Sequence, residues 1–361
     1  MNLDTTWIES ERLAEIQISL LRKLMSEAGP QCINLALGEL GFAFPKTLAE
    51  HAIKLLEDGQ PRYTANAGLD DLRDVIAQTY NTSAKCICVC NGAEEALYIA
   101  LHALVNPLDK VAIPDPDYPA YPCLVNLAMG QVIRLPFAED FCTIDWDLWQ
   151  NRLQNVKILL MSTPSNPTGY CLNKSDATKL SEILNSLGII LIVDEIYKEV
   201  YTKPVEVIDY NIFDRVIRIG GLSKSHLMSG WRIGWLCSHP RLVEAATKLK
   251  QYISTCPAWL AQKLSIFALN NPQIPQDIRS ALDINRRIVV DNFSDFIYHL
   301  PSATPYAMLL TTNDMQKAED LLHKGVLTVP GSAFGDMTKD YLRINYAVPH
   351  ELLKEAIRRI S

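Results

Sequence analysis

The sequence contains no apolar run long enough to span a membrane. The segment Met1–Trp7 carries an early acid and no apolar stretch, so we expect no signal peptide. A net charge of −7 argues against a broad nucleic-acid-binding surface. No Gly-x-Gly-x-x-Gly follows a first strand, which argues against a nicotinamide enzyme on a doubly wound sheet. Repeats, low-complexity stretches and flexible linkers are also missing.

Cysteines are scattered and odd in number, nine in 361 residues. This favours reduced thiols in the cytoplasm over a disulfide framework. Cys86, Cys88 and Cys90 alternate, which places them on one face of a predicted strand. No histidine or second cysteine pair lies near, so we interpret them as small buried apolar residues and predict no metal site.

Hydrophobic residues make up 48% of the chain, and several form short, nearly continuous apolar runs. Such runs are typical of strands buried on both faces of a parallel sheet with helices between them. Each ends in polar or aromatic residues, and ligands of open α/β sheets bind at the carboxyl ends of strands. These strands are predicted at 86–90, 111–113, 157–161, 189–193 and 216–219.

The flanking segments predict a smaller α+β domain. Helical spacing covers 9–28, a short strand follows at 33–37, and Pro45 opens a helix that Gly59 ends. Later segments predict helices at 240–270 and 276–299, strands around 308–310 and 342–344, and a helix from 349. We therefore expect an N-terminal arm with part of the small domain (1–44), a large cofactor-binding domain (45–236) and a small C-terminal domain (237–361).

Lys224 follows a short apolar strand, two glycines and Ser223, with little other charge nearby, and Arg232 comes eight residues later. Desolvation and a neighbouring cation lower the pKa of a lysine, which makes a neutral amine available to attack a carbonyl. Pyridoxal phosphate is the aldehyde cofactor that forms a Schiff base with such a lysine. Ser223 and Arg232 suit its phosphate. On its own, the stretch is better explained as a strand-end lysine that reaches solvent.

A second phosphate signal lies at Asn91–Tyr98, where a strand, a glycine turn and a helix follow one another. Free N–H groups at a helix N-terminus bind phosphate. Tyr63 lies in a loop without a clear apolar partner, and on its own it is interpreted as a half-buried loop aromatic.

Together these stretches resemble the class I/II pyridoxal-phosphate aminotransferases of fold type I, the group that includes aspartate aminotransferase. The resemblance covers residue 33 to the end and depends on motifs in the family's order. They are Gly38-Glu39, Tyr63, Gly92-Ala93-Glu94, Tyr118, Ser165–Gly169, Asp194–Tyr197, Ser223-Lys224, Gly230–Arg232, Pro330–Ser332, Phe334-Gly335 and Leu342–Ile344.

The resemblance implies a mostly parallel sheet with helices on both faces and a smaller domain built from both termini. Lys224 would hold the cofactor and shuttle the substrate proton, and Asp194 would pair with the pyridinium nitrogen. Tyr197 and Asn166 would donate to the phenolate oxygen, and Tyr118 would stack on the ring. The phosphate would bind Gly92, Ala93, Glu94, Ser223 and Arg232, and the substrate would contact Gly38, Asn166 and Arg343, with the arginine on the α-carboxylate.

Tyr63 matches a family tyrosine that reaches the neighbouring subunit's phosphate, which implies a homodimer with shared active sites. The implied reaction is a ping-pong transfer of an amino group from an amino acid to a 2-oxo acid. A β-lyase, an elimination enzyme or a cyclising enzyme on the same fold is the alternative. A non-catalytic sensor fused to a DNA-binding domain is less compatible with the short N-terminal arm and the acidic charge.

Two features depart from the family pattern. Pro301–Ala307 replaces the usual glycine-aromatic segment, which leaves substrate range and domain closure open. Glu94 stands where some aspartate-active relatives have a lysine, which predicts a neutral or basic donor. Glu94 in the first turn is also explained as a cap of its own helix. We interpret His226 as packing beside the pocket.

Overall fold

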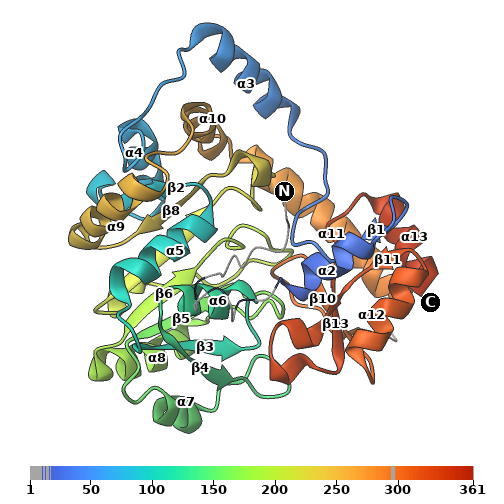
Figure 1. Ribbon diagram of the computed structural model, residues 1–361. Coiled ribbons are helices and arrows are strands. Elements are labelled where there is room, and N and C mark those ends of the chain that lie inside the picture. The colour runs from blue at the N-terminus through green and yellow to red at the C-terminus, as the bar shows by residue number, and fades with distance from the viewer. Residues whose placement is uncertain (1–9, 11–12, 14–15, 17, 294–296, 361) are drawn as a thin grey trace, which may run out of the picture.

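The computed structural model describes residues 10, 13, 16, 18–293 and 297–360. Its largest element is a seven-stranded sheet of order β2-β8-β7-β6-β5-β3-β4, in which β8 alone runs antiparallel to its neighbours (Figure 1). The strands are β2 (Ile87–Cys90), β3 (Lys110–Asp115), β4 (Gln131–Pro136), β5 (Ile158–Ser162), β6 (Ile190–Asp194), β7 (Val216–Gly221) and β8 (Gly234–Cys237).

Helices cover both faces of this sheet, because successive strand residues alternate between two apolar cores. In β5, Ile158 and Leu160 pack in the core with α5 and α9, whereas Leu159 and Met161 pack with α7 and α8. The covering helices are α5 (Ala93–Leu104), α6 (Ala120–Leu127), α7 (Trp146–Arg152), α8 (Lys174–Leu187) and α9 (Pro240–Ile253). The predicted fold class is confirmed.

Two strands of this sheet were not predicted. β4 is a sheet edge, mostly half-buried, with Gln131 and Arg134 in its sequence, so it lacks a continuous apolar run. β8 is only four residues long. Cys86 was placed wrongly: it ends a 3₁₀ turn before β2, and only Cys88 and Cys90 lie in the strand.

The second sheet is antiparallel, with order β12-β13-β10-β9. Its strands are β9 (Ile297–His299), β10 (Tyr306–Leu310), β12 (Val329–Pro330) and β13 (Tyr341–Asn345). The helices α11 (Gln273–Phe293), α12 (Asp314–His323) and α13 (His350–Ile360) lie on the same side of the molecule (Figure 1). The predicted helix 276–299 was wrong at its end, where the chain turns into β9.

The N-terminal segment joins this second body, as predicted. β1 (Ile33–Asn34) pairs in parallel with β11 (Val326–Leu327), and Leu24 of α2 (Leu20–Glu27) packs against Phe334. Within the predicted helix 9–28, Ser19 caps a helix that starts at Leu20, so the described part is not one continuous helix. Most of residues 9–17 lie outside the described residues.

The predicted helix 240–270 is two helices, α9 and α10 (Trp259–Leu269), separated by a turn at Ser254–Ala258. α9 packs on α5, and α10 packs on α3 (Lys46–Asp58) and α4 (Asp70–Thr79). Residues 240–269 therefore pack mainly with helices of the predicted large domain (45–236). Among the described residues, no helix is both long and apolar enough to span a membrane.

Candidate active site

The carboxyl ends of the central parallel strands meet in register. Ser162 of β5 lies opposite Asp194 of β6, and Asp194 lies opposite Ile219 of β7. The chain after each strand therefore leaves the sheet at one edge, and Asn166 and Lys224 follow β5 and β7 there. This register explains how predicted site residues that are distant in sequence are brought together.

Lys224 lies in the turn after β7 and is half-buried. Burial lowers the pKa of its amine to about 8, and the positive charges of Arg343 and Arg232 act in the same direction. Glu39 and Asp194 oppose the shift, so both carboxylates lie within electrostatic range of the amine. A lysine with this pKa supplies a substantial neutral fraction near pH 8, as covalent attachment to an aldehyde requires.

Asp194 is buried at the end of β6, with 4% of its surface exposed. Its carboxylate accepts hydrogen bonds from the Tyr121 hydroxyl at 3.0 Å and from the Ile196 N–H at 3.0 Å. Burial nevertheless raises its pKa to about 6. A buried carboxylate in this state is stabilised by a cationic partner, and a protonated ring nitrogen is one.

Arg343 of β13 is 2% exposed and lies against Asn166. Its Nη1 donates to the Asn166 Oδ1 at 2.7 Å, and its Nη2 donates to the Ala36 carbonyl. Nε is buried and finds no hydrogen-bond partner among the described residues. An arginine with an unsatisfied donor in a closed site fits a carboxylate ligand.

The turn before α5 and the Arg232 guanidinium form a close-packed pair. Gly92 caps α5 with φ +91°, and Arg232 donates to the Asn91 carbonyl at 3.4 Å and to the Ser229 carbonyl at 2.9 Å. A Cβ at Gly92 would lie 2.5 Å from the Arg232 Nη2. Ala93 and Glu94 open the helix behind this turn, and Ser223 is buried next to Lys224. Helix N–H groups beside a guanidinium form a cradle suited to phosphate.

Glu94 lies in the first turn of α5, as predicted, but Glu95 makes the capping contacts to Asn91. The Glu94 carboxylate instead accepts a hydrogen bond from the Tyr118 hydroxyl at 3.4 Å. Although Glu94 is solvent-exposed overall, packing around its carboxyl raises its pKa, against the pull of Arg232 and Lys224. Glu94 therefore lies at the edge of the site.

Gly38 lies against the hydroxyls of two tyrosines. A Cβ at this position would lie 2.7 Å from the Tyr306 Oη and 3.4 Å from the Tyr197 Oη. The Tyr197 and Tyr306 hydroxyls are hydrogen-bonded to each other, and both side chains are buried. The Asn345 side chain holds the Gly38 loop through the carbonyls of Leu37 and Glu39, each at 2.7 Å.

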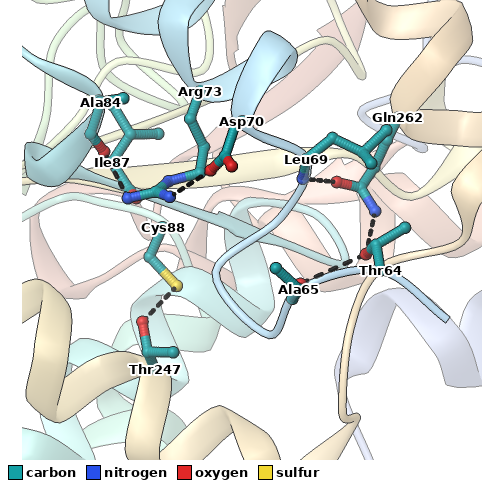
Figure 2. A network of polar contacts seen from close by, with 10 residues as sticks. All are labelled: Thr64, Ala65, Leu69, Asp70, Arg73, Ala84, Ile87, Cys88, Thr247 and Gln262. Carbon is teal, nitrogen blue, oxygen red and sulfur yellow. Dashed lines mark hydrogen bonds and ion pairs between the residues drawn. The ribbon is translucent and has the colours of Figure 1, made fainter.

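Tyr63 differs from the other predicted residues, because 89% of its surface is exposed. The loop that carries it is nevertheless well anchored (Figure 2). Gln262 donates to the Thr64 hydroxyl at 2.9 Å and accepts from the Leu69 N–H at 2.7 Å. The anchored loop thus holds Tyr63 at the surface of this chain.

Sequence reasoning missed three buried residues of the site: Asp117, Tyr121 and Tyr306. Asp117 accepts from the Ser162 hydroxyl at 2.5 Å and from the Tyr118 N–H at 2.8 Å, and burial raises its pKa to about 7. It therefore ties the ends of β3 and β5 together. A signal existed only for Tyr121, which lies one helical turn after Tyr118.

His226 is buried next to the lysine turn, as interpreted from the sequence. Its Nδ1 lies 2.8 Å from the Ser225 hydroxyl, and burial lowers its pKa to about 4. The ring is therefore neutral at ordinary pH. Among the described residues, no group of three or more His, Cys, Asp or Glu side chains is arranged to hold a metal ion.

This arrangement brings together a lysine with a lowered pKa, a buried carboxylate, a glycine turn beside the Arg232 guanidinium and a buried arginine with an unsatisfied donor. Comparison with known proteins agrees: residues 30–360 match the family described as aminotransferase class I and II. The chain belongs to this family. It is an aminotransferase, and its cofactor is pyridoxal phosphate.

Relatives match along nearly the whole chain. The putative aminotransferase YugH of Bacillus subtilis is 32% identical over 98% of this chain and 97% of its own. Aspartate aminotransferase of Pyrococcus abyssi is 30% identical over 98% of this chain and 97% of its own. Among solved structures, aspartate aminotransferase from Thermotoga maritima superposes with a TM-score of 0.90 at 28% identity, covering 98% of both chains.

The described residues fit the cofactor. Bound pyridoxal phosphate supplies an electron-withdrawing ring that stabilises negative charge on the substrate carbon. The unsatisfied Arg343 Nε, the buried Asp194 and the close Gly92–Arg232 contact match a carboxylate ligand, a ring nitrogen and a phosphate respectively.

Proposed function

We propose that this aminotransferase takes amino donors with neutral or basic side chains. The observation that carries the proposal is the position of Glu94. Its carboxylate bonds to Tyr118 at the edge of the pocket and acts electrostatically on Lys224. A second carboxylate on the substrate would be repelled there.

The cations of the site support the same proposal. We assign Lys224 to the cofactor, Arg232 to its phosphate and Arg343 to the α-carboxylate, so each of these charges is used. Several relatives are named aspartate aminotransferases, and an aspartate donor is the competing outcome.

A donor panel with 2-oxoglutarate and pyruvate as acceptors tests the proposal. Neutral or basic amino acids should give the highest kcat/KM, and Glu94→Gln should improve aspartate relative to a neutral donor. Glu95→Gln is the matched control, because Glu95 binds Asn91 and not Tyr118. Aspartate as the best donor of the unmodified enzyme would reject the proposal.

The roles of the other residues form part of the same proposal. Asp194 holds the ring nitrogen, Tyr197 and Asn166 donate to the phenolate oxygen, and Tyr118 stacks on the ring. Gly92, Ala93, Glu94, Ser223 and Arg232 surround the phosphate, and Gly38, Asn166 and Arg343 contact the substrate. Lys224 first binds the cofactor and then carries the proton that leaves the substrate α-carbon.

We also propose a homodimer in which Tyr63 completes the partner's site. Its exposure on a loop held by Gln262 supports this, since a tyrosine that is 89% exposed has no packing role in its own chain. Ile53 and Leu56 of α3 are 58% and 54% exposed, and α3 lies at the outer edge of the molecule in Figure 1. An apolar helix face of this kind is suited to cover by a second copy.

We also propose a cytoplasmic location, as expected from the sequence. The nine cysteines are all free, which supports it.

For the domains, we keep the arm 1–44 and propose that the second boundary falls near residue 270 instead of 236. The reason is that α9 packs on α5, and α10 packs on α3 and α4.

A further inference from the structure

Tyr306 connects two groups of the active site that lie on different sheets. Its ring lies under the Arg343 guanidinium, with 4.2 Å between the guanidinium carbon and the ring centroid. Its hydroxyl is hydrogen-bonded to the hydroxyl of Tyr197, which follows β6. The Tyr306 side chain is completely buried, so no solvent competes for these contacts.

The acidity of the two tyrosines gives this hydrogen bond a direction, because the more acidic hydroxyl donates. The Arg343 cation over the Tyr306 ring stabilises negative charge on its oxygen. Burial raises the pKa of Tyr306, but Arg343 and the bond to Tyr197 both lower it. For Tyr197, burial raises the pKa well above its ordinary value and Tyr306 raises it further, although Arg343 acts in the opposite direction. Because the Arg343 guanidinium lies over the Tyr306 ring, we take Tyr306 as the donor and the Tyr197 oxygen as the acceptor.

The direction matters, because a hydroxyl has only one hydrogen to donate. When the Tyr197 oxygen accepts from Tyr306, its own hydrogen is free for a third group. Accepting a hydrogen bond also makes a hydroxyl a stronger donor. Gly38 closes the space beside the hydroxyl pair, which restricts the directions that the Tyr197 hydroxyl can take.

We propose that Tyr306 is a positioning residue that directs the Tyr197 hydrogen toward the phenolate oxygen of pyridoxal phosphate, with the Arg343 charge acting through its ring. This inference rests on the proposed role of Tyr197. A donor to that oxygen lowers the pKa of the Lys224-bound chromophore. Loss of the Tyr306 hydroxyl should weaken the donor and raise this pKa.

The test is an absorbance titration of the cofactor-loaded enzyme against pH, compared with Tyr306→Phe, Tyr197→Phe and the double variant. Phe keeps the ring under Arg343 and the packing volume. In Tyr306→Phe the chromophore pKa should rise by roughly 0.5 to 1, the equivalent of one neutral hydrogen bond. Tyr197→Phe should raise the chromophore pKa more than Tyr306→Phe does. The double variant should have the same chromophore pKa as Tyr197→Phe.

Tyr346→Phe is the matched control. This tyrosine is equally buried, but its hydroxyl donates to the Thr304 carbonyl at 3.1 Å. The chromophore pKa of the Tyr346→Phe variant should equal that of the unmodified enzyme.

The outcomes separate this inference from the assignment on which it rests. If Tyr197→Phe shifts the pKa and Tyr306→Phe does not, the inference is wrong and the role of Tyr197 stands. The inference is also wrong if Tyr306→Phe shifts the chromophore pKa equally in the unmodified enzyme and in the Tyr197→Phe variant. Tyr306 would then act on the chromophore by a route that does not include Tyr197. If Tyr197→Phe has no effect, the assigned role of Tyr197 fails as well.

Discussion

The charges around Lys224 determine its reactivity. Arg343 and Arg232 favour the neutral amine, whereas Glu39 and Asp194 favour the charged one, and burial decides the balance toward a pKa of about 8. Attachment of the cofactor requires the neutral amine. The residues that we propose to bind the phosphate and the substrate, Arg232 and Arg343, thus also lower the pKa of the lysine.

This pKa predicts how the cofactor-free enzyme takes up pyridoxal phosphate. The rate of uptake should rise with pH and level off above about 8, since the neutral fraction of the Lys224 amine does so. Stopped-flow absorbance at a series of pH values measures this rate. A rate that levels off only near pH 10.5, the ordinary lysine value, would contradict the environment described for Lys224.

We expect the buried Asp194 carboxylate to destabilise the cofactor-free protein and to stabilise the protein with bound cofactor. Burial raises its pKa to about 6, above the ordinary value of about 3.9. The folded cofactor-free protein therefore binds a proton more tightly than the unfolded chain, and this stabilisation is lost as pH rises from about 4 to 6. At pH 8, cofactor-free Asp194→Asn should be more stable than the unmodified protein, by up to about 3 kcal/mol.

Urea unfolding at pH 4 and pH 8 checks this prediction. The difference should vanish at pH 4 and reverse when cofactor is bound, because the ring nitrogen then pairs with the carboxylate. A cofactor-free variant that is less stable at pH 8 would show that Asp194 is not strained by burial.

Arg343→Ala should raise KM for the amino donor by roughly 10- to 100-fold, which corresponds to the loss of a charge-assisted hydrogen-bonded pair. The effect on kcat should be smaller, because the lysine and the cofactor remain. Steady-state kinetics measure both. Arg279→Ala, which removes an ion pair to Glu199 on the surface, should leave KM unchanged.

At the scale of single elements, the turn between β2 and α5 depends on Gly92. Gly92→Ala places a Cβ 2.5 Å from Arg232 and strains a φ of +91°, so cofactor affinity should fall at least tenfold. Gly188→Ala is the control, since Gly188 also has a positive φ (+67°) but no atom within 4 Å of an added Cβ. Equal losses in both variants would mean that backbone strain, not the phosphate cradle, explains the effect.

The elements also show what the sequence could predict. Buried parallel strands leave continuous apolar runs, so β3, β5, β6 and β7 were predicted, with ends one or two residues short of the observed ones. The edge strand β4 was missed, because most of its residues are only half-buried and it lacks a continuous apolar run. The break between α9 and α10 was missed because both halves keep helical apolar spacing.

The residues that sequence could not predict depend on contacts between distant elements. Tyr306 acquires its place because β10 pairs with β13, which brings it next to Arg343 and Tyr197. In the sequence, Asp117 is one of several polar residues after β3, and its hydrogen bond from the Ser162 hydroxyl is seen only in the structure. No local pattern distinguishes such residues.

At the scale of the whole molecule, the proposed dimer with shared active sites predicts complementation between subunits. Tyr63→Ala and Lys224→Ala chains should each be poorly active alone. Co-expressed chains should recover activity, because each mixed dimer contains one site with both native residues. With random assortment, about one quarter of all sites are native. No recovery would mean that Tyr63 acts within its own chain or not at all.

The central claim is that Lys224 carries the cofactor. Borohydride reduction of the pyridoxal-phosphate-loaded enzyme, followed by peptide mass analysis, tests it most directly. We predict a pyridoxyl phosphate group on Lys224 and its loss in Lys224→Ala. A modified lysine elsewhere in the unmodified enzyme, or no modified peptide, would contradict the account.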